Sequence, residues 1–169
     1  EDLGPDGTGL VHLDLPPGEI LVRFSAANAT GEVIDRWDAP IIVPDLSGTS
    51  LALATPVFVR ARTTAGYQAL RRGEPGAPSP DREFRTTDLV VVRTAVADAP
   101  GGTASSVTAE VLTREGKVLA ALPASSTAAT RHQIDLPLRS LALGEYVLRF
   151  TVTRAGATAS TTAAFAIVR

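Results

Sequence analysis

The residues with the best spacing for metal binding are Asp45, Ser47 and Thr49, which follow the apolar run at 41–43. A strand that leads into carboxylate and hydroxyl groups at alternate positions offers the oxygen ligands that Mg²⁺ prefers. Pro44 interrupts this strand, and the residues after Thr49 have a strand pattern where such a site requires a helix. We therefore interpret the segment as an interdomain turn whose polar side chains cap backbone groups, and we predict no metal and no cofactor.

Two histidines, His12 and His132, are candidates for a general base. Each stands just before an apolar-Asp-Leu-Pro run, at nearly equivalent places in two similar segments. Histidines in separate modules cannot share one catalytic triad unless the modules fold onto each other, and the sequence has no Gly-x-Ser-x-Gly motif. The pattern predicts surface histidines that belong to a repeat.

Two carboxylates, Asp135 and Glu145, could form the acid–base pair of a glycosidase. Their counterparts Asp14 and Glu19 occupy the same contexts in the other copy of the repeat, which indicates strand-edge and turn roles instead. The sequence therefore predicts no catalytic residues, and we expect the protein not to be an enzyme.

Exposed aromatic rings are the usual platforms for sugar binding, and aromatic residues make up only 5% of the chain. Trp37 and Tyr67 are the candidates for exposed rings and therefore for ligand binding. The sequence predicts that four phenylalanines are core residues: Phe24, Phe84, Phe150 and Phe165.

Composition excludes several classes of protein. The 169 residues carry a net charge of −2 without a basic stripe, which argues against nucleic-acid binding. The absence of cysteine excludes disulfides, zinc fingers and thiol nucleophiles, and no apolar run approaches the roughly 18–20 residues of a membrane span. Asp2, Asp6 and Asp14 lack the spacing of an EF-hand and are predicted to be solvated turn carboxylates.

Two segments, residues 15–26 and 141–152, resemble each other. Each contains Gly-Glu, then three apolar residues, then Arg-Phe. The similarity extends upstream, where His-Leu-Asp-Leu-Pro at 12–16 matches Gln-Ile-Asp-Leu-Pro at 133–137. After each copy a polar turn leads into another apolar run, and a repeated strand–turn–strand unit is typical of tandem β modules.

Alternating apolar residues and turn signals predict an all-β protein. In the first part of the chain we expect strands at 11–15, 20–24 and 33–43, with a hairpin loop at 28–31. The later part contains one possible helical turn at 67–72. Seven strands are predicted there: 51–60, 89–96, 107–112, 118–122, 131–136, 145–153 and 158–168.

The penultimate strand begins with the pattern Leu-x-x-Gly-x-Tyr, formed by Leu141, Gly144 and Tyr146. This pattern resembles the tyrosine corner of immunoglobulin-like sandwiches, in which the phenol bonds to the backbone just upstream. We predict an immunoglobulin- or fibronectin-type-III-like antiparallel sandwich over residues 48–169. Residues 1–47 are predicted to form a partial module of the same kind or a three-stranded meander, which makes the arrangement tandem.

Residues 55–62, 82–88 and 136–146 carry a wider resemblance: Thr-Pro-Val-Phe-Val-Arg-Ala-Arg, Arg-Glu-Phe-Arg-Thr-Thr-Asp and Leu-Pro-Leu-Arg-Ser-Leu-Ala-Leu-Gly-Glu-Tyr. With these stretches, residues 40–169 resemble a β-sandwich region of long bacterial proteins that contain a von Willebrand factor A domain. The resemblance implies secretion, a non-enzymatic role and a place after an A domain.

We therefore expect a non-catalytic structural or protein-interaction module, secreted, periplasmic or on the cell surface of a bacterium. Its partner would be another protein or an upstream domain of the same chain, bound on an open strand edge such as 51–60. The absence of methionine leads us to expect a processed or partial chain. The alternative is a carbohydrate-binding β-sandwich.

Overall fold

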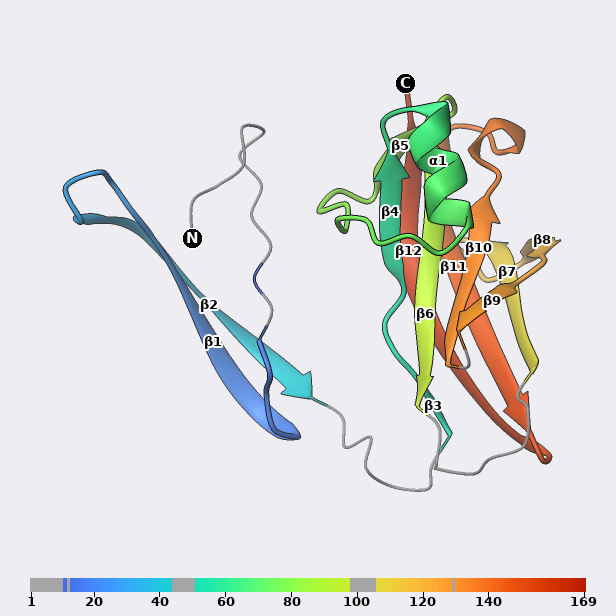
Figure 1. Ribbon diagram of the computed structural model, residues 1–169, viewed down its shortest axis with the longest axis horizontal. Coiled ribbons are helices and arrows are strands. Elements are labelled where there is room, and N and C mark those ends of the chain that lie inside the picture. The colour runs from blue at the N-terminus through green and yellow to red at the C-terminus, as the bar shows by residue number, and fades with distance from the viewer. Residues whose placement is uncertain (1–10, 12, 44–50, 98–105, 129) are drawn as a thin grey trace. The chain divides into compact units, whose positions relative to one another are not determined.

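The structure is a computed structural model, which describes residues 11, 13–43, 51–97, 106–128 and 130–169 (Figure 1). The chain divides into two compact units: a smaller one of residues 11–48 and a larger one that contains residues 49–169. Each unit is described by itself. The turn predicted at 44–48 lies outside the described residues. Within the described ranges, no helix has the length and apolar character needed to cross a membrane.

The smaller unit contains an antiparallel hairpin of β1 (Gly18–Ala27) and β2 (Val33–Val43). Asn28 organises the loop between them, because its side-chain oxygen accepts hydrogen bonds from the backbone N–H groups of Thr30 at 3.1 Å and Glu32 at 3.0 Å. An asparagine that bonds to the backbone just after itself stabilises a tight turn. The predicted loop and the strand predicted at 33–43 are thus confirmed.

The strand predicted at 11–15 is wrong, because the residues described in that range belong to no strand. Alternation of apolar residues stabilises a strand only where a neighbouring backbone offers hydrogen bonds. Pro16 and Pro17 follow directly, and their nitrogens carry no hydrogen to donate to a ladder. The described part of this unit is a two-stranded hairpin, not a three-stranded meander.

The larger unit is a sandwich of two five-stranded sheets. In the first sheet, β6 (Leu89–Ala97) pairs on one side with β3 (Ala52–Leu53) and β4 (Val57–Ala61). On its other side β6 pairs with β10 (Arg131–Leu136), which also pairs with β9 (Ser125–Ala128). All pairings in this sheet are antiparallel.

The second sheet has the order β5–β12–β11–β7–β8. Its strands are β5 (Glu83–Arg85), β7 (Ser106–Thr113), β8 (Val118–Leu122), β11 (Gly144–Arg154) and β12 (Ala157–Val168). β5 pairs with β12 in parallel, whereas the other pairs are antiparallel. The chain therefore crosses from the first sheet to the second between β4 and β5. This immunoglobulin-like sandwich confirms the predicted fold class, and β5 and β9 are strands that the sequence pattern did not predict.

Apolar side chains from both sheets fill the space between them. β6 is buried on both faces, since Val90, Val91 and Val92 are all essentially inaccessible to solvent. Val90 and Val92 face the core, and Val91 packs under α1 (Thr64–Arg71), which lies across this sheet (Figure 1). Burial on both faces explains why the segment is a continuous β-branched run rather than an alternating one.

The helix α1 is longer than the turn predicted at 67–72, and side chains satisfy both of its ends. The hydroxyl of Thr63 accepts a hydrogen bond from the backbone N–H of Gly66 at 3.0 Å, which caps the first turn. At the other end, Arg93 donates to the carbonyl of Leu70 at 2.8 Å, and the Gln133 amide donates to the carbonyl of Arg71 at 2.7 Å. Two sheet residues therefore bind carbonyls of the last helical turn, and the Leu70 carbonyl also accepts a hydrogen bond from the backbone N–H of Gly73 at 2.9 Å.

The loop after α1 approaches the helix closely at Gly76, where an added methyl group would lie 2.6 Å from both Leu70 Cδ2 and Val59 Cγ1. We expect Gly76→Ala to lower the free energy of unfolding by about 1–3 kcal/mol, because both obstructing side chains are buried in one cluster. Chemical denaturation measures this loss. In a double-mutant cycle with Leu70→Ala, the double variant should lose less stability than the sum of the losses of the two single variants. Strict additivity would contradict the proposed clash.

Candidate functional site

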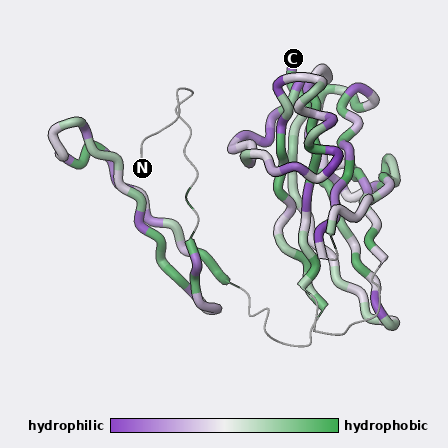
Figure 2. The backbone as a smooth tube through the Cα atoms, viewed as in Figure 1, coloured by the Kyte–Doolittle hydropathy of each residue, from purple (hydrophilic) through white to green (hydrophobic). Residues whose placement is uncertain are grey.

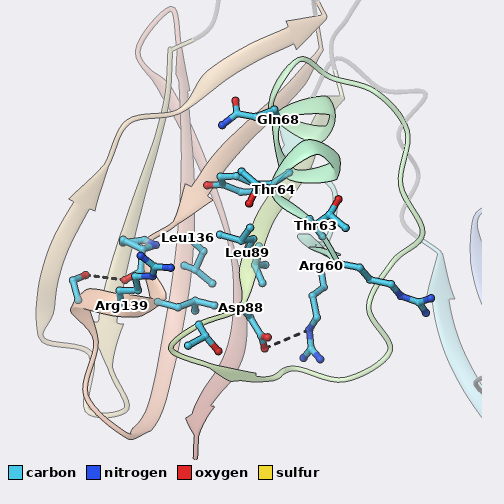
Figure 3. Close-up of a pocket in the computed structure, with 16 residues that line it drawn as sticks. Arg60, Thr63, Thr64, Gln68, Asp88, Leu89, Leu136 and Arg139 are labelled. Carbon is cyan, nitrogen blue, oxygen red and sulfur yellow. Dashed lines mark hydrogen bonds and ion pairs between the residues drawn. The ribbon is translucent and has the colours of Figure 1, made fainter.

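An open groove of about 990 Å³ lies where the end of β4, the start of α1, the turn before β6 and the 3₁₀ helix η1 (Leu138–Ser140) meet (Figure 3). Residues from all three stretches 55–62, 82–88 and 136–146 line it. These stretches are far apart in the sequence, so only the fold brings them to one place.

Arg60 and Asp88 form one wall of the groove (Figure 3). The Arg60 guanidinium donates to the carbonyl of Glu83 at 2.6 Å, lies 3.6 Å from the Asp88 carboxylate and stacks over the ring of Phe84 at 4.9 Å. Asp88 also accepts a hydrogen bond from the backbone N–H of Arg85 at 2.9 Å. Both charged groups are thus engaged in joining β4 to the β5–β6 turn.

Arg139 enters the groove from η1, and hydroxyl and amide groups of Thr63, Thr64 and Gln68 line it beside α1 (Figure 3). Such a lining can bind a polar or anionic group through hydrogen bonds. The sequence patterns did not identify Arg60, Asp88 or Arg139 as site residues. Each lies in one of the three stretches that carry the family resemblance, but a stretch does not reveal which of its side chains meet those of another.

Tyr67, a predicted ligand residue, is half-buried and packs against the cluster under α1. Burial and the nearby Asp135 carboxylate, to which its hydroxyl is hydrogen-bonded, raise the pKa of Tyr67 to about 12. The guanidinium of Arg71 lies 6.0 Å from the ring centre and forms a 2.8 Å ion pair with Asp135. The ring is therefore part of a polar network between α1 and β10, which leaves little of it for stacking on a sugar.

Trp37, the other predicted ligand residue, lies on β2 in the smaller unit and is 64% exposed. Its indole stacks on the ring of Phe24, with centres 5.4 Å apart and planes at 22°. The prediction that Phe24 belongs to a core is wrong for the described residues, since Phe24 is 44% exposed. Phe84, Phe150 and Phe165 are core residues as predicted.

His132 is not the surface histidine that the sequence predicts, because only 5% of it is exposed. It lies on β10 opposite Thr94 of β6, and its Nδ1 is 3.2 Å from the hydroxyl of Ser126. Its Nε2 is buried without a hydrogen-bond partner among the described residues. Burial lowers the pKa of His132 below its ordinary value of 6.5, which favours the neutral ring. The repeat in the sequence could not show which face of the strand is covered.

The structure does not assemble the other candidate groups into a reactive site. Asp135 pairs with Arg71, and Glu145 pairs with Arg114 at 2.9 Å. His12, Asp45, Ser47 and Thr49 lie outside the described residues, as do Asp2 and Asp6. In the part of the chain that is described, no group of three or more histidines and carboxylates is placed to hold a metal ion.

Leu141, Gly144 and Tyr146 form the turn that the sequence singles out. The Tyr146 hydroxyl donates to the carbonyl of Ala142 at 2.9 Å, and its ring stacks on Phe165 at 5.5 Å. Gly144 has a φ of +150°, which side-chain-bearing residues rarely adopt, and Leu141 packs against the core. The phenol thus joins the chain ahead of β11 to the strand itself, as in a tyrosine corner.

The outer edge of β8 is a second surface of interest. This strand ends the second sheet, contains only apolar residues and exposes nearly half of Val118 and of Leu119. A hollow of about 450 Å³ next to it is lined by Leu119, Leu143 and Tyr146, among others. Leu143 is also exposed, and charged residues share the lining of the hollow, among them Arg114, Glu115 and Glu145. We call the exposed side chains of β8 together with this hollow the β8 surface.

Comparisons with known proteins do not assign the chain to a family. No protein-family model and no curated protein matches the chain.

The tyrosine corner predicts a local loss of protection when the phenol is removed. We expect Tyr146→Phe to lower the free energy of unfolding by about 1 kcal/mol, because the hydrogen bond to Ala142 is lost while the ring remains. Hydrogen exchange should quicken at residues 141–143 in this variant. Tyr67→Phe, which removes the only other phenol, serves as control and should leave exchange at 141–143 unchanged. Equal effects of both variants there would contradict the assignment.

The burial of His132 predicts a pH dependence of stability. Since its pKa is lower in the folded chain than in the unfolded chain, the unfolded state binds the proton first as the pH falls. Neutral His132 makes its full contribution to the free energy of unfolding above the pKa of about 6.5 that it has in the unfolded chain. This contribution declines at lower pH. Unfolding free energies measured from pH 7.5 to 5 should therefore fall less steeply for His132→Asn than for the unaltered chain. Parallel curves for the two proteins would refute this.

Proposed function

We propose that the chain is a non-catalytic module of an exported bacterial protein, in which the larger unit acts as a rigid spacer and binds a partner protein along the β8 surface. The observation that carries the proposal is the uncharged apolar edge strand, Val118 to Leu122, at the end of a sheet. The resemblance of 55–62, 82–88 and 136–146 to a region of proteins with a von Willebrand factor A domain supports the exported bacterial setting.

The spacer role is supported by the way the two sheets are joined. The apolar core is continuous between them, and the hydrogen bond of Tyr146 to Ala142 fixes the crossing into β11. A close-packed core resists deformation, so the sandwich can hold its two ends at a constant separation. Such a unit can present a binding edge at a defined distance from a neighbouring domain.

The β8 surface suits an extended segment of a partner that adds a strand to the sheet. Backbone hydrogen bonds of an edge strand provide affinity in this mode, and hollows for alternate side chains provide selectivity. The hollow beside Leu119 and Leu143 would take an apolar side chain, and the Arg114–Glu145 ion pair borders it. Natural proteins usually place charges or prolines on exposed edges to prevent such pairing, and β8 has neither.

The edge predicted for partner binding, residues 51–60, has less support. Pro56 is buried between β3 and β4, and the backbone N–H of Ser79 donates to the carbonyl of Phe58 at 2.7 Å. The loop after α1 therefore occupies part of this edge. Carbohydrate binding has less support too, because the Tyr67 ring is engaged with Arg71 and Asp135.

The absence of cysteine allows a direct test, because a single introduced cysteine can be labelled alone. Leu119→Cys carrying a thiol-linked photo-crosslinker, in the protein expressed by its own producing cells, should give one discrete cross-linked species. The control is Thr151→Cys on β11, a strand that has neighbours on both sides. Mass spectrometry then identifies the partner and the cross-linked peptide, which should be an extended segment.

The outcome depends on the difference between the two positions. A discrete product at residue 119 with none at 151 supports docking on the β8 surface, provided that Leu119→Lys abolishes it without lowering the thermal midpoint. Cross-links of equal yield at both positions, or none at residue 119, would overturn the proposal.

A further inference from the structure

The hairpin β1–β2 repeats the geometry of the hairpin β11–β12. Gly18 stands opposite Val43 at the open end of the first hairpin, and Gly144 stands opposite Ile167 at the open end of the second. Both glycines have a positive φ, +131° and +150°, with no atom close to where a side chain would begin. The sequence repeat is thus also a repeat of backbone conformation and strand pairing.

Corresponding arginines on β11 and β1 each form an ion pair with a neighbouring strand, which is β7 in the larger unit and β2 in the smaller unit. Arg149 stands opposite Glu110 of β7 and contacts its carboxylate at 2.6 Å. Its counterpart Arg23 stands opposite Asp38 of β2 and contacts that carboxylate at 2.7 Å. In the larger unit the face of β11 that carries Arg149 points away from the sandwich core. The face of β1 that carries Arg23 therefore corresponds to an outer face.

The opposite face of β1–β2 corresponds to the inner face of β11–β12. In the larger unit this inner face is buried, because the sheet that contains β4, β6 and β10 covers it. The inner residues of β11 are Tyr146, Leu148 and Phe150, and their counterparts on β1 are Ile20, Val22 and Phe24. On the second strands, Ala163, Phe165 and Ile167 correspond to Ala39, Ile41 and Val43.

The inner faces of the two hairpins have side chains of similar size at their centres. Leu148 pairs with the buried Ala163, and Val22 pairs with Ala39. An alanine at this place leaves space that a large side chain of a covering sheet can fill, as layers of large and small residues interlock in a core. The first hairpin thus has a small residue at the same place on its inner face as the hairpin that receives a second sheet.

This inner face of β1–β2 is uncovered among the described residues. Phe24 is 44% exposed and Trp37 is 64% exposed, and hydrophobic stretches lie on both strands of the hairpin (Figure 2). An isolated two-stranded hairpin is only marginally stable in water. The opposite face also exposes apolar side chains, with Leu21 at 61% and Ile42 at 76%. It is therefore the correspondence with β11–β12 that identifies the inner face as the interaction surface.

We propose that this face is the docking surface for the first sheet of a second immunoglobulin-like sandwich, whose last two strands are β1 and β2. The occupant is an antiparallel sheet with an apolar face, equivalent to the β4–β6–β10 sheet and carried ahead of the hairpin in the same polypeptide. The inference extends the proposed spacer role, since it makes the spacer a row of sandwiches. It does not depend on partner binding at the β8 surface.

Hydroxyl-radical footprinting with mass spectrometry tests the proposal, because Trp37 is the only tryptophan in the chain. The protein purified from its producing cells is compared with the isolated chain of residues 1–169. We expect Trp37 to be readily oxidised in the isolated chain and to lose most of that oxidation in the natural protein. Leu21, which is 61% exposed on the opposite face of the same hairpin, is the matched control and should react equally in both samples.

A pair of substitutions in the natural protein separates coverage from a general effect on the hairpin. Trp37→Ser should lower the thermal midpoint, whereas Leu21→Ser should leave it unchanged. Equal oxidation of Trp37 in both samples would refute the proposal, as would a natural protein without strands ahead of the hairpin. Protection of Trp37 already in the isolated chain, together with the mass of a dimer, would assign the face to a second copy instead. None of these outcomes bears on cross-linking at residue 119, so the two proposals can fail separately.

Discussion

The sandwich depends on a cluster of four aromatic rings where the two sheets meet. Phe58 of β4 stacks on Phe84 of β5 at 5.5 Å and contacts Phe165 of β12 at 6.0 Å, and Phe165 in turn stacks on Tyr146. Phe58 belongs to the first sheet, whereas the other three rings belong to the second sheet. Ring pairs of this kind contribute about 0.5–1.5 kcal/mol each beyond their buried area. The cluster therefore joins the sheets at the point where the chain crosses between them.

Arginines support this arrangement from outside the core. Arg60 and Arg82 place guanidinium groups over the rings of Phe84 and Phe58, at 4.9 and 5.6 Å. Arg93, whose pKa is lowered by burial and by the charge of Arg131, binds the C-terminal carbonyls of α1. A planar guanidinium can donate several hydrogen bonds at once and can stack on a ring, which a lysine ammonium cannot do equally well. Several arginines of the sequence thus have structural roles.

Stability and interaction are divided between different parts of the molecule. The groove beside α1 has a volume of about 990 Å³, but its charged wall joins β4 to the turn before β6 through Arg60 and Asp88. The strand β8 itself and the inner face of β1–β2 expose apolar side chains, although the Arg114–Glu145 ion pair borders the hollow of the β8 surface. Apolar area left in water has an unfavourable free energy, which is why we place the proposed interactions on these two surfaces rather than in the groove.

The sequence by itself determined the features that depend on neighbouring residues. Alternation and turn residues located most strands, and Leu141, Gly144 and Tyr146 predicted the corner, because each of these signals lies within a few residues. Tertiary structure decided what depends on distant backbone. It placed the short β5 parallel to β12, buried His132, and left 11–15 outside any described strand. These outcomes follow from which backbone groups remain unpaired and which faces become covered, and no local pattern contains that information.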